Sequence, residues 1–251
     1  MHSFEGVLCA MGWKIFSHSV FLLNHNLKDA LRISSPLIVT MLLNLFLGGA
    51  MAIDNLEAGT PQGTGPNLFL TLLSAIAGLW VAVAWHRFVL LEERGGSLPT
   101  FHGSRMVSYF IVILLMMIGL ALGAGGAGAI AGIALSNITP LFVLAMLAIA
   151  VTTLWAFYRL SPLLPAAALG EAMGVKQAWE ATADMSGAVL GAALLLIVFV
   201  LICGGAAMLV LFQVNILIGV ILMGVVQWAY TMVGISVLTT IYGITVEGRE
   251  I

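Results

Sequence analysis

Few residues in this sequence could do chemistry. His86 and Arg87 stand out because they end an apolar run in LWVAVAWHRFVLLEERGG, residues 79–96. A histidine can move protons or bind a metal, and an arginine can bind a carboxylate or a phosphate. The pair either belongs to a site or anchors a helix where a membrane ends. An arginine costs about 2.5–3.5 kcal/mol at the centre of a membrane helix and less near its edge. We therefore favour the anchoring interpretation for both residues.

Other signatures of catalysis are missing from the sequence. There is no H-E-x-x-H, no G-x-S-x-G and no phosphate-binding glycine loop. The two cysteines, Cys9 and Cys203, have no metal-ligand spacing. His18 and His25 lie two helical turns apart, so a metal there would need ligands from elsewhere. We expect no enzyme, no cofactor, no metal and no nucleic-acid partner.

The composition places this chain in a membrane. Of its 251 residues, 61% are hydrophobic and only 8% are charged, and the mean hydropathy is +1.13. Such a chain has too little polar surface to cover a water-soluble protein of this size. We expect an all-α polytopic membrane protein whose first partner is the lipid bilayer.

Six runs are long enough to cross a bilayer, which takes roughly 20 apolar residues per helix. The predicted six-helix bundle uses residues 34–53, 67–91, 106–135, 140–160, 187–212 and 215–244. Residues 1–33 precede it as a cytoplasmic segment with an interfacial amphipathic helix. Its apolar residues recur at three- and four-residue spacing: Phe16, Val20, Leu23, Leu27 and Leu31. We expect no cleavable signal peptide, because residues 1–14 lack a basic start followed by an apolar core.

The positions of the basic residues predict the orientation. All nine lie before the first span, after the last one, or at the ends of the second and fourth spans and in the connections that follow them. The other three connections contain none. By the positive-inside bias, both termini are cytoplasmic. Every carboxylate also lies at or outside a predicted membrane edge, which disfavours an ion-coupled pump.

The connection between the fourth and fifth spans has a distinct pattern. Pro162 and Pro165 end or kink the helix just beyond Arg159. Residues 166–187 then predict a short cytoplasmic helix, or else a continuation of the next membrane helix. Arg159 is expected to pair with Glu171 or Glu180, or to cap carbonyls that the prolines expose.

A motif runs through this connection and reads Arg159-x-Ser161-x-x-x-Pro165, then Glu171, then Ala178-Trp179-x-x-Thr182. Together with the N-terminal helix and the six spans, it resembles a group of bacterial inner-membrane families. One is the membrane domain fused to some glycerophosphodiester phosphodiesterases, and others stand alone without assigned chemistry. The resemblance covers most of the chain and implies polar residues at the cytoplasmic ends of the second and fourth spans. No phosphodiesterase domain is present in this sequence, so that activity is not implied.

Two further sets of residues point to contacts inside the membrane. Asn44 and Gln227 either hydrogen-bond between helices or line a path for a substrate. Glycines at four-residue spacing let helix backbones approach closely, either within the bundle or against another membrane protein. They are Gly119, Gly123, Gly128, Gly132, Gly187 and Gly191.

Two functions are compatible with this reading. The favoured one is a non-enzymatic accessory, scaffold or assembly subunit of a larger membrane-protein complex. The alternative is a carrier or channel-like protein for lipid or small apolar solutes, with lipid bound. The first predicts a strip of small residues covered by a partner. The second predicts a cavity lined by Asn44, Gln227 and several threonines.

Overall fold

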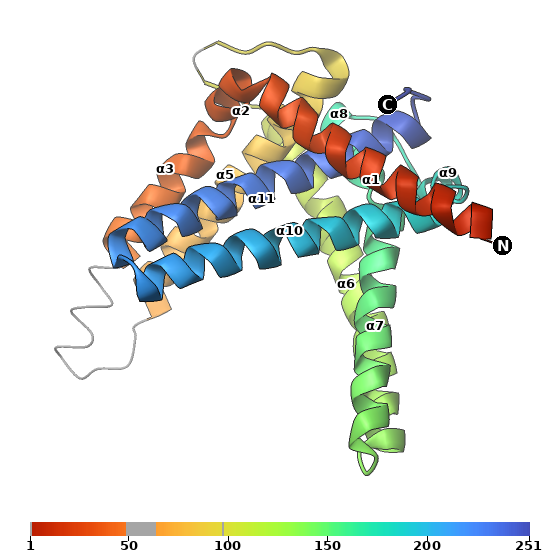
Figure 1. The fold of residues 1–251 in the computed structure, drawn as a ribbon. Coiled ribbons are helices and arrows are strands. Elements are labelled where there is room, and N and C mark those ends of the chain that lie inside the picture. Colours follow the sequence, from red (N-terminus) through yellow and green to blue (C-terminus); the bar gives the residue numbers. More distant parts are fainter. Residues whose placement is uncertain (1, 49–63, 97) are drawn as a thin grey trace.

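The computed structural model describes residues 2–48, 64–96 and 98–251, and nearly all of them are helical (Figure 1). No strand occurs in these ranges, so the predicted all-α class is confirmed. The elements are α1 (His2–His25), α2 (Leu27–Ile33), α3 (Ser35–Leu43), the π-helical turn η1 (Asn44–Gly48), α5 (Thr64–Leu91), α6 (Gly103–Leu135), α7 (Thr139–Leu160), α8 (Leu163–Leu169), α9 (Val175–Ala181), α10 (Ser186–Gln213) and α11 (Ile216–Thr245).

The described helices include five that are long and apolar enough to cross a membrane. They comprise Leu68–Leu91, Gly103–Leu135, Thr139–Leu169, Ser186–Gln213 and Ile216–Thr245. A sixth crossing is obtained if α2 and α3, which meet at a bend of 57°, form one broken span. Residues 49–53 of the first predicted span lie outside the described residues. The chain is a multi-pass membrane protein.

The bend between α2 and α3 has a local cause. Pro36 lies in the first turn of α3 and has no amide hydrogen to bond the carbonyl of Arg32. The Ser35 hydroxyl donates to that carbonyl instead, at 2.8 Å. The Trp228 indole donates to the Ser34 hydroxyl at 2.8 Å, which ties the bend to α11. The bend is therefore held by side chains on both sides of the break.

The N-terminal helix α1 lies across α10 and α11 (Figure 1). At the crossing with α10, Gly12 faces Gly191, and a Cβ added at Gly12 would meet the Ala188 carbonyl oxygen at 3.0 Å and the Gly191 Cα at 3.2 Å. Further along α1, the Ser19 hydroxyl lies 3.0 Å from the Thr240 hydroxyl. Helix α1 thus packs as part of the bundle rather than lying alone at the interface.

The predicted apolar face of the N-terminal segment is partly wrong. Leu23 is buried, but Leu27 and Leu31 are 43% and 45% exposed. The reason is that α1 ends at His25 and α2 starts a new helix, so one helical periodicity does not run through both. The stripe that faces the bundle consists of Gly12, Ile15, Ser19 and Leu23.

The connection between α7 and α10 also differs from the single helix that was expected. Helix α7 ends at Leu160, as the prolines predicted, and the buried α8 follows. Gly170 ends α8 with a left-handed φ of 91°, and α9 begins only at Val175. A side chain at position 170 would overlap the Arg105 guanidinium. Both the conformation and the space require glycine here.

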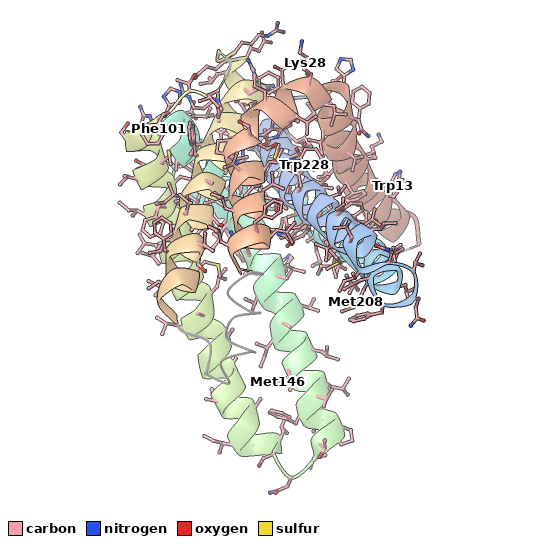
Figure 2. All side chains as sticks on the ribbon, turned by 90° about the vertical axis from the view of Figure 1, so that its left-hand side faces the viewer. Trp13, Lys28, Phe101, Met146, Met208 and Trp228 are labelled. Atoms are coloured by element: carbon pink, nitrogen blue, oxygen red, sulfur yellow. The ribbon has the colours of Figure 1, made fainter. Side chains whose placement is uncertain are left out.

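Burial is concentrated at one end of the molecule. The segments of α5, α6, α10 and α11 that lie nearest α1 and α8 pack with those two helices into one core. The far halves of α6 and α7 form a hairpin that projects from this body, with Met146 on its outer part (Figures 1 and 2). Most of its side chains are exposed, and Ile133 reaches 86%. Residues 117–151 are called the projecting hairpin from here on.

The crossing of α1 and α10 generates a first prediction. Replacing Gly12 by leucine forces a side chain against the α10 backbone, so we expect the folded state to lose about 1–3 kcal/mol. Thermal unfolding of the purified protein in detergent measures this loss. Gly204→Leu is the control, since nothing lies within 4 Å of a Cβ at that position of α10. Equal melting temperatures for the two variants would contradict the packing described.

Candidate functional site

The polar residues predicted at the cytoplasmic edge lie in separate hydrogen-bonded groups. His86 contacts α6 and α11, Arg87 contacts the connection after α5, and Arg159 contacts α9. Each group ties together elements that are distant in sequence. Their geometry decides whether any of them does chemistry.

His86 is fully buried rather than exposed at a membrane edge. Its Nδ1 lies 2.8 Å from the Thr239 hydroxyl and its Nε2 lies 3.4 Å from the Tyr109 hydroxyl. Thr239 donates its only hydrogen to the Ile235 carbonyl at 2.9 Å. Nδ1 therefore donates to Thr239, and Nε2 faces the Tyr109 hydroxyl. A ring nitrogen that donates to Thr239 cannot act as the base that would activate this hydroxyl as a nucleophile.

Arg87 pairs with a carboxylate in the connection that follows α5. Its Nε and Nη2 each lie 2.7 Å from Oε2 of Glu93, and its Nη1 donates to the Ala168 carbonyl at 3.3 Å. The other carboxylate oxygen lies 2.6 Å from Nε2 of His102. Partial burial raises the pKa of Glu93, but hydrogen bonds and charge from His102 and Arg87 outweigh it and hold that pKa below its usual value. The group fastens the connection to α8.

Two more arginines bind backbone carbonyls at the same end of the molecule. Arg249 donates to the carbonyls of Leu90 at 2.9 Å and Val89 at 3.3 Å, in the last turn of α5. Arg32 donates to the carbonyls of Gly95 at 2.6 Å and Gly96 at 3.0 Å. The carbonyls that end a helix have no intrahelical partner and carry partial negative charge. Arg249 satisfies both needs at the end of α5, whereas Arg32 binds carbonyls of the connection that follows it.

Arg159 is 4% exposed and makes its contacts with α9. Its Nη2 donates to the Trp179 carbonyl, and its guanidinium carbon lies 4.4 Å from the Trp179 ring centroid and 5.6 Å from that of Trp155. The Thr182 hydroxyl lies 3.0 Å from the Arg159 carbonyl. The guanidinium is therefore stabilised by aromatic faces and by the C-terminal end of a helix.

The expected ion pair between Arg159 and either glutamate is wrong. Glu171 accepts a hydrogen bond from the Tyr242 hydroxyl at 2.6 Å, and Glu180 lies on the exposed face of α9, 3.8 Å from Lys176. Arg159 does bind a backbone carbonyl, which was the alternative, but not one that the prolines expose. The carbonyl belongs to Trp179, because α9 folds back onto the end of α7.

The two polar residues predicted inside the membrane have different surroundings. Asn44 donates to the Thr40 carbonyl at 2.8 Å and to the Ser74 hydroxyl at 2.9 Å, and so links the end of α3 to α5. Gln227 is exposed on α11, and its side chain has no hydrogen-bond partner among the described residues. Neither residue lines the pocket beside Arg32 and Glu93 or the one beside His18 and Thr240.

Some of the candidate glycines pack against another helix and others do not. Nothing lies within 4 Å of a Cβ placed at Gly119, Gly123 or Gly132, and at Gly128 the nearest atom is Met146 Cε at 3.8 Å. Gly191 instead meets Gly12 at the crossing of α1 and α10, 3.6 Å from its Cα. Gly187 is exposed at the start of α10. Close packing inside the bundle accounts for Gly191. On α6, Gly119 and Gly123 face outward, whereas Gly128 and Gly132 lie on the opposite side of the helix, where Gly128 faces α7.

A cavity of about 250 Å³ lies between α1, α5, α11 and the C-terminal residues. His18, Thr239, Thr240 and Arg249 contribute polar groups to its lining. Sequence reasoning missed it because these residues are more than 200 positions apart at the extremes. Among the described residues, no three His, Cys, Asp or Glu side chains gather as a metal site would require. The cavity suits a small, partly apolar molecule or ordered water.

The contacts of Arg159 generate a second prediction. Lysine keeps the charge but loses the planar guanidinium that both donates to Trp179 and stacks on its ring. We expect Arg159→Lys to lower the free energy of unfolding by about 1–3 kcal/mol. Thermal unfolding followed by tryptophan emission reports the change, since Trp155 and Trp179 flank the site. Lys176→Arg, on the exposed ion pair, should change it by less than about 0.5 kcal/mol.

Glu93 generates a prediction of pH dependence. A carboxyl whose pKa is lower in the folded than in the unfolded chain stabilises the fold fully above its usual value of 4.5 and progressively less as the pH falls below it. Glu93→Gln should therefore lower the melting temperature at about pH 7, and the difference from the parent chain should shrink towards about pH 3. Glu92→Gln, on the exposed neighbour, is the control. A difference that stays constant with pH would contradict the assignment.

Comparisons with protein-family models, with curated proteins and with solved structures give no match to this chain. Its function must therefore be inferred from its own geometry. The fold itself establishes an all-α protein with several apolar helices that can span a membrane.

Proposed function

We propose that this chain is a non-enzymatic, multi-pass protein of a bacterial inner membrane and serves as an accessory, scaffold or assembly subunit of a larger membrane-protein complex. The observation that carries the proposal is the outward-facing glycine surface on the projecting hairpin. We define this hairpin face by Gly119 and Gly123, which lie one turn apart on the same side of α6.

Membrane helices associate mainly through close packing. Lipid tails are as apolar as leucine, so helices gain little from hiding apolar surface from them. Association depends instead on close packing, and small residues permit it because they let two backbones approach. Both positions of the hairpin face have nothing within 4 Å of a Cβ. Another membrane helix can therefore approach this face without displacing a side chain at those positions.

The other end of the molecule supports the orientation in the proposal. Arg32, Arg87 and Arg249 all bind groups at the end of α5 or in the connection that follows it. The basic connections therefore gather at one end, as the positive-inside bias requires of a cytoplasmic face. The resemblance to bacterial inner-membrane families supports the choice of membrane. We place both termini in the cytoplasm.

The side chains that could do chemistry are all engaged in contacts within the fold, which favours a non-enzymatic role. His86 is buried, and each of its ring nitrogens lies within hydrogen-bond distance of a hydroxyl. Arg87 and Arg159 are occupied by a carboxylate, by carbonyls and by aromatic rings. All three residues stabilise the fold, which leaves none of them free to bind a substrate.

A carrier of lipid or small apolar solutes is the second candidate, and the cavity beside His18 favours it. That cavity lies at the basic end and is lined by Thr239 and Thr240. Neither Asn44 nor Gln227 lines it. A carrier would hold its solute in this cavity. Asn44 and Gln227 would then not line the path of the solute.

The fourth prediction tests the proposal on the hairpin face. Gly123→Leu fills this face without touching the rest of the chain, so stoichiometric partners should be reduced at least about ten-fold after gentle extraction and size-exclusion chromatography. Quantitative mass spectrometry of the co-eluting proteins measures the loss. Gly204→Leu, an equally open position on α10, should leave them unchanged. A particle that carries only lipid, with the parent chain as with both variants, would overturn the proposal and favour the carrier.

A further inference from the structure

The side chain of Gln227 is out of place in a lipid-facing position. It lies in the middle of α11, about 16 Å along the helix from Ile216 and thus near the centre of a hydrocarbon layer about 30 Å thick. It is exposed, and none of the described residues hydrogen-bonds to its amide. A polar group that meets only hydrocarbon loses the hydrogen bonds that water would provide. Such a group is stabilised when a second helix brings a polar partner.

The surface around Gln227 allows a second helix to approach. Gly224 lies on the preceding turn, and nothing is within 4 Å of a Cβ placed there. Met223 and Tyr230 lie on the same side of α11 and are 40% and 39% exposed. These four residues, Met223, Gly224, Gln227 and Tyr230, are called the Gln227 strip. A small residue beside a polar one is the combination that membrane helices use for close association.

We propose that the Gln227 strip is the contact between two copies of this chain, related by a two-fold axis along the membrane normal. A carboxamide is both a donor and an acceptor, so two Gln227 side chains facing each other satisfy both with reciprocal hydrogen bonds. A two-fold axis places a residue opposite its own copy. The interaction is self-complementary.

The membrane selects a second copy over an unrelated helix as the occupant. The basic residues orient every copy in the same way, so each places Gln227 at the same depth and on a parallel helix. An unrelated helix would need a polar residue at that depth by coincidence of sequence. The inference goes beyond the proposed function, because it concerns α11 and self-association, whereas the hairpin face on α6 concerns a different protein.

Cysteine crosslinking in native membranes tests the proposal. With Cys9 and Cys203 replaced by serine and alanine, Met223→Cys places a thiol on the strip and Val225→Cys places one at nearly the same depth on the opposite side of α11, where Val225 is 55% exposed. Mild oxidation should give at least about ten-fold more covalent dimer with Met223→Cys. Adding Gln227→Leu to Met223→Cys should remove most of that dimer.

A solution measurement makes the result independent of crosslinking. In liposomes, energy transfer between labelled copies of the full chain should report a dimer whose dissociation constant rises by roughly three- to thirty-fold in Gln227→Leu, as expected for loss of an interhelical hydrogen bond. Gln213→Leu, on an exposed glutamine at the end of α10, is the matched control and should leave it unchanged. A monomeric chain, equal crosslinking from the two cysteine positions, or a dimer unaffected by Gln227→Leu would each overturn the proposal. Loss of co-eluting partners in Gly123→Leu with the dimer intact would leave both proposals standing separately.

Discussion

Backbone carbonyls at the ends of helices must find donors, and in this protein arginine side chains supply many of them. Arg249 binds the last turn of α5, Arg87 binds a carbonyl at the end of α8, and Arg159 binds one at the end of α9. Hydrogen bonds from charged donors contribute about 1.5–3 kcal/mol each. The short helices α8 and α9 are too small to be stable alone. Their positions depend on these contacts, which join α8 to the end of α5 and α9 to the end of α7.

This dependence explains why the packed core lies at one end of the molecule. The charged residues that satisfy helix ends belong near the aqueous boundary, because a charge at mid-membrane is costly. The tight contacts therefore form where α1, α8 and the ends of α5, α10 and α11 meet. Away from that end, the helices pack in pairs rather than around one core, and α6 and α7 leave the body as a hairpin (Figure 1). Gly123 and Gln227, on which the two proposals rest, lie on these diverging parts.

Composition and span length predicted the all-α membrane fold, since apolar runs of this length have few other uses. The sequence also predicted the end of α7, because Pro162 and Pro165 follow it directly. The bend at Ser34 was not predicted. Pro36 lies beside it, but the direction of the bend is held by Trp228, which is 194 positions away in the sequence. His86 was misplaced for the same reason, since its partner Thr239 is 153 positions away. Nor does spacing show that Arg159 binds a carbonyl when two glutamates stand nearby in sequence. A single sequence reveals periodicity but not which distant groups meet.

The projecting hairpin has a mechanical consequence. Helix α6 has 33 residues and is therefore about 50 Å long, well beyond the thickness of the hydrocarbon layer. A helix with such excess length accommodates by tilting, and the tilt grows as the bilayer thins. The outer part of the hairpin is exposed on most sides, so few contacts with the body oppose a change in its angle. The opposite end is held by arginine hydrogen bonds. A change in bilayer thickness is therefore expected to alter the angle of the hairpin before it disturbs the packed end.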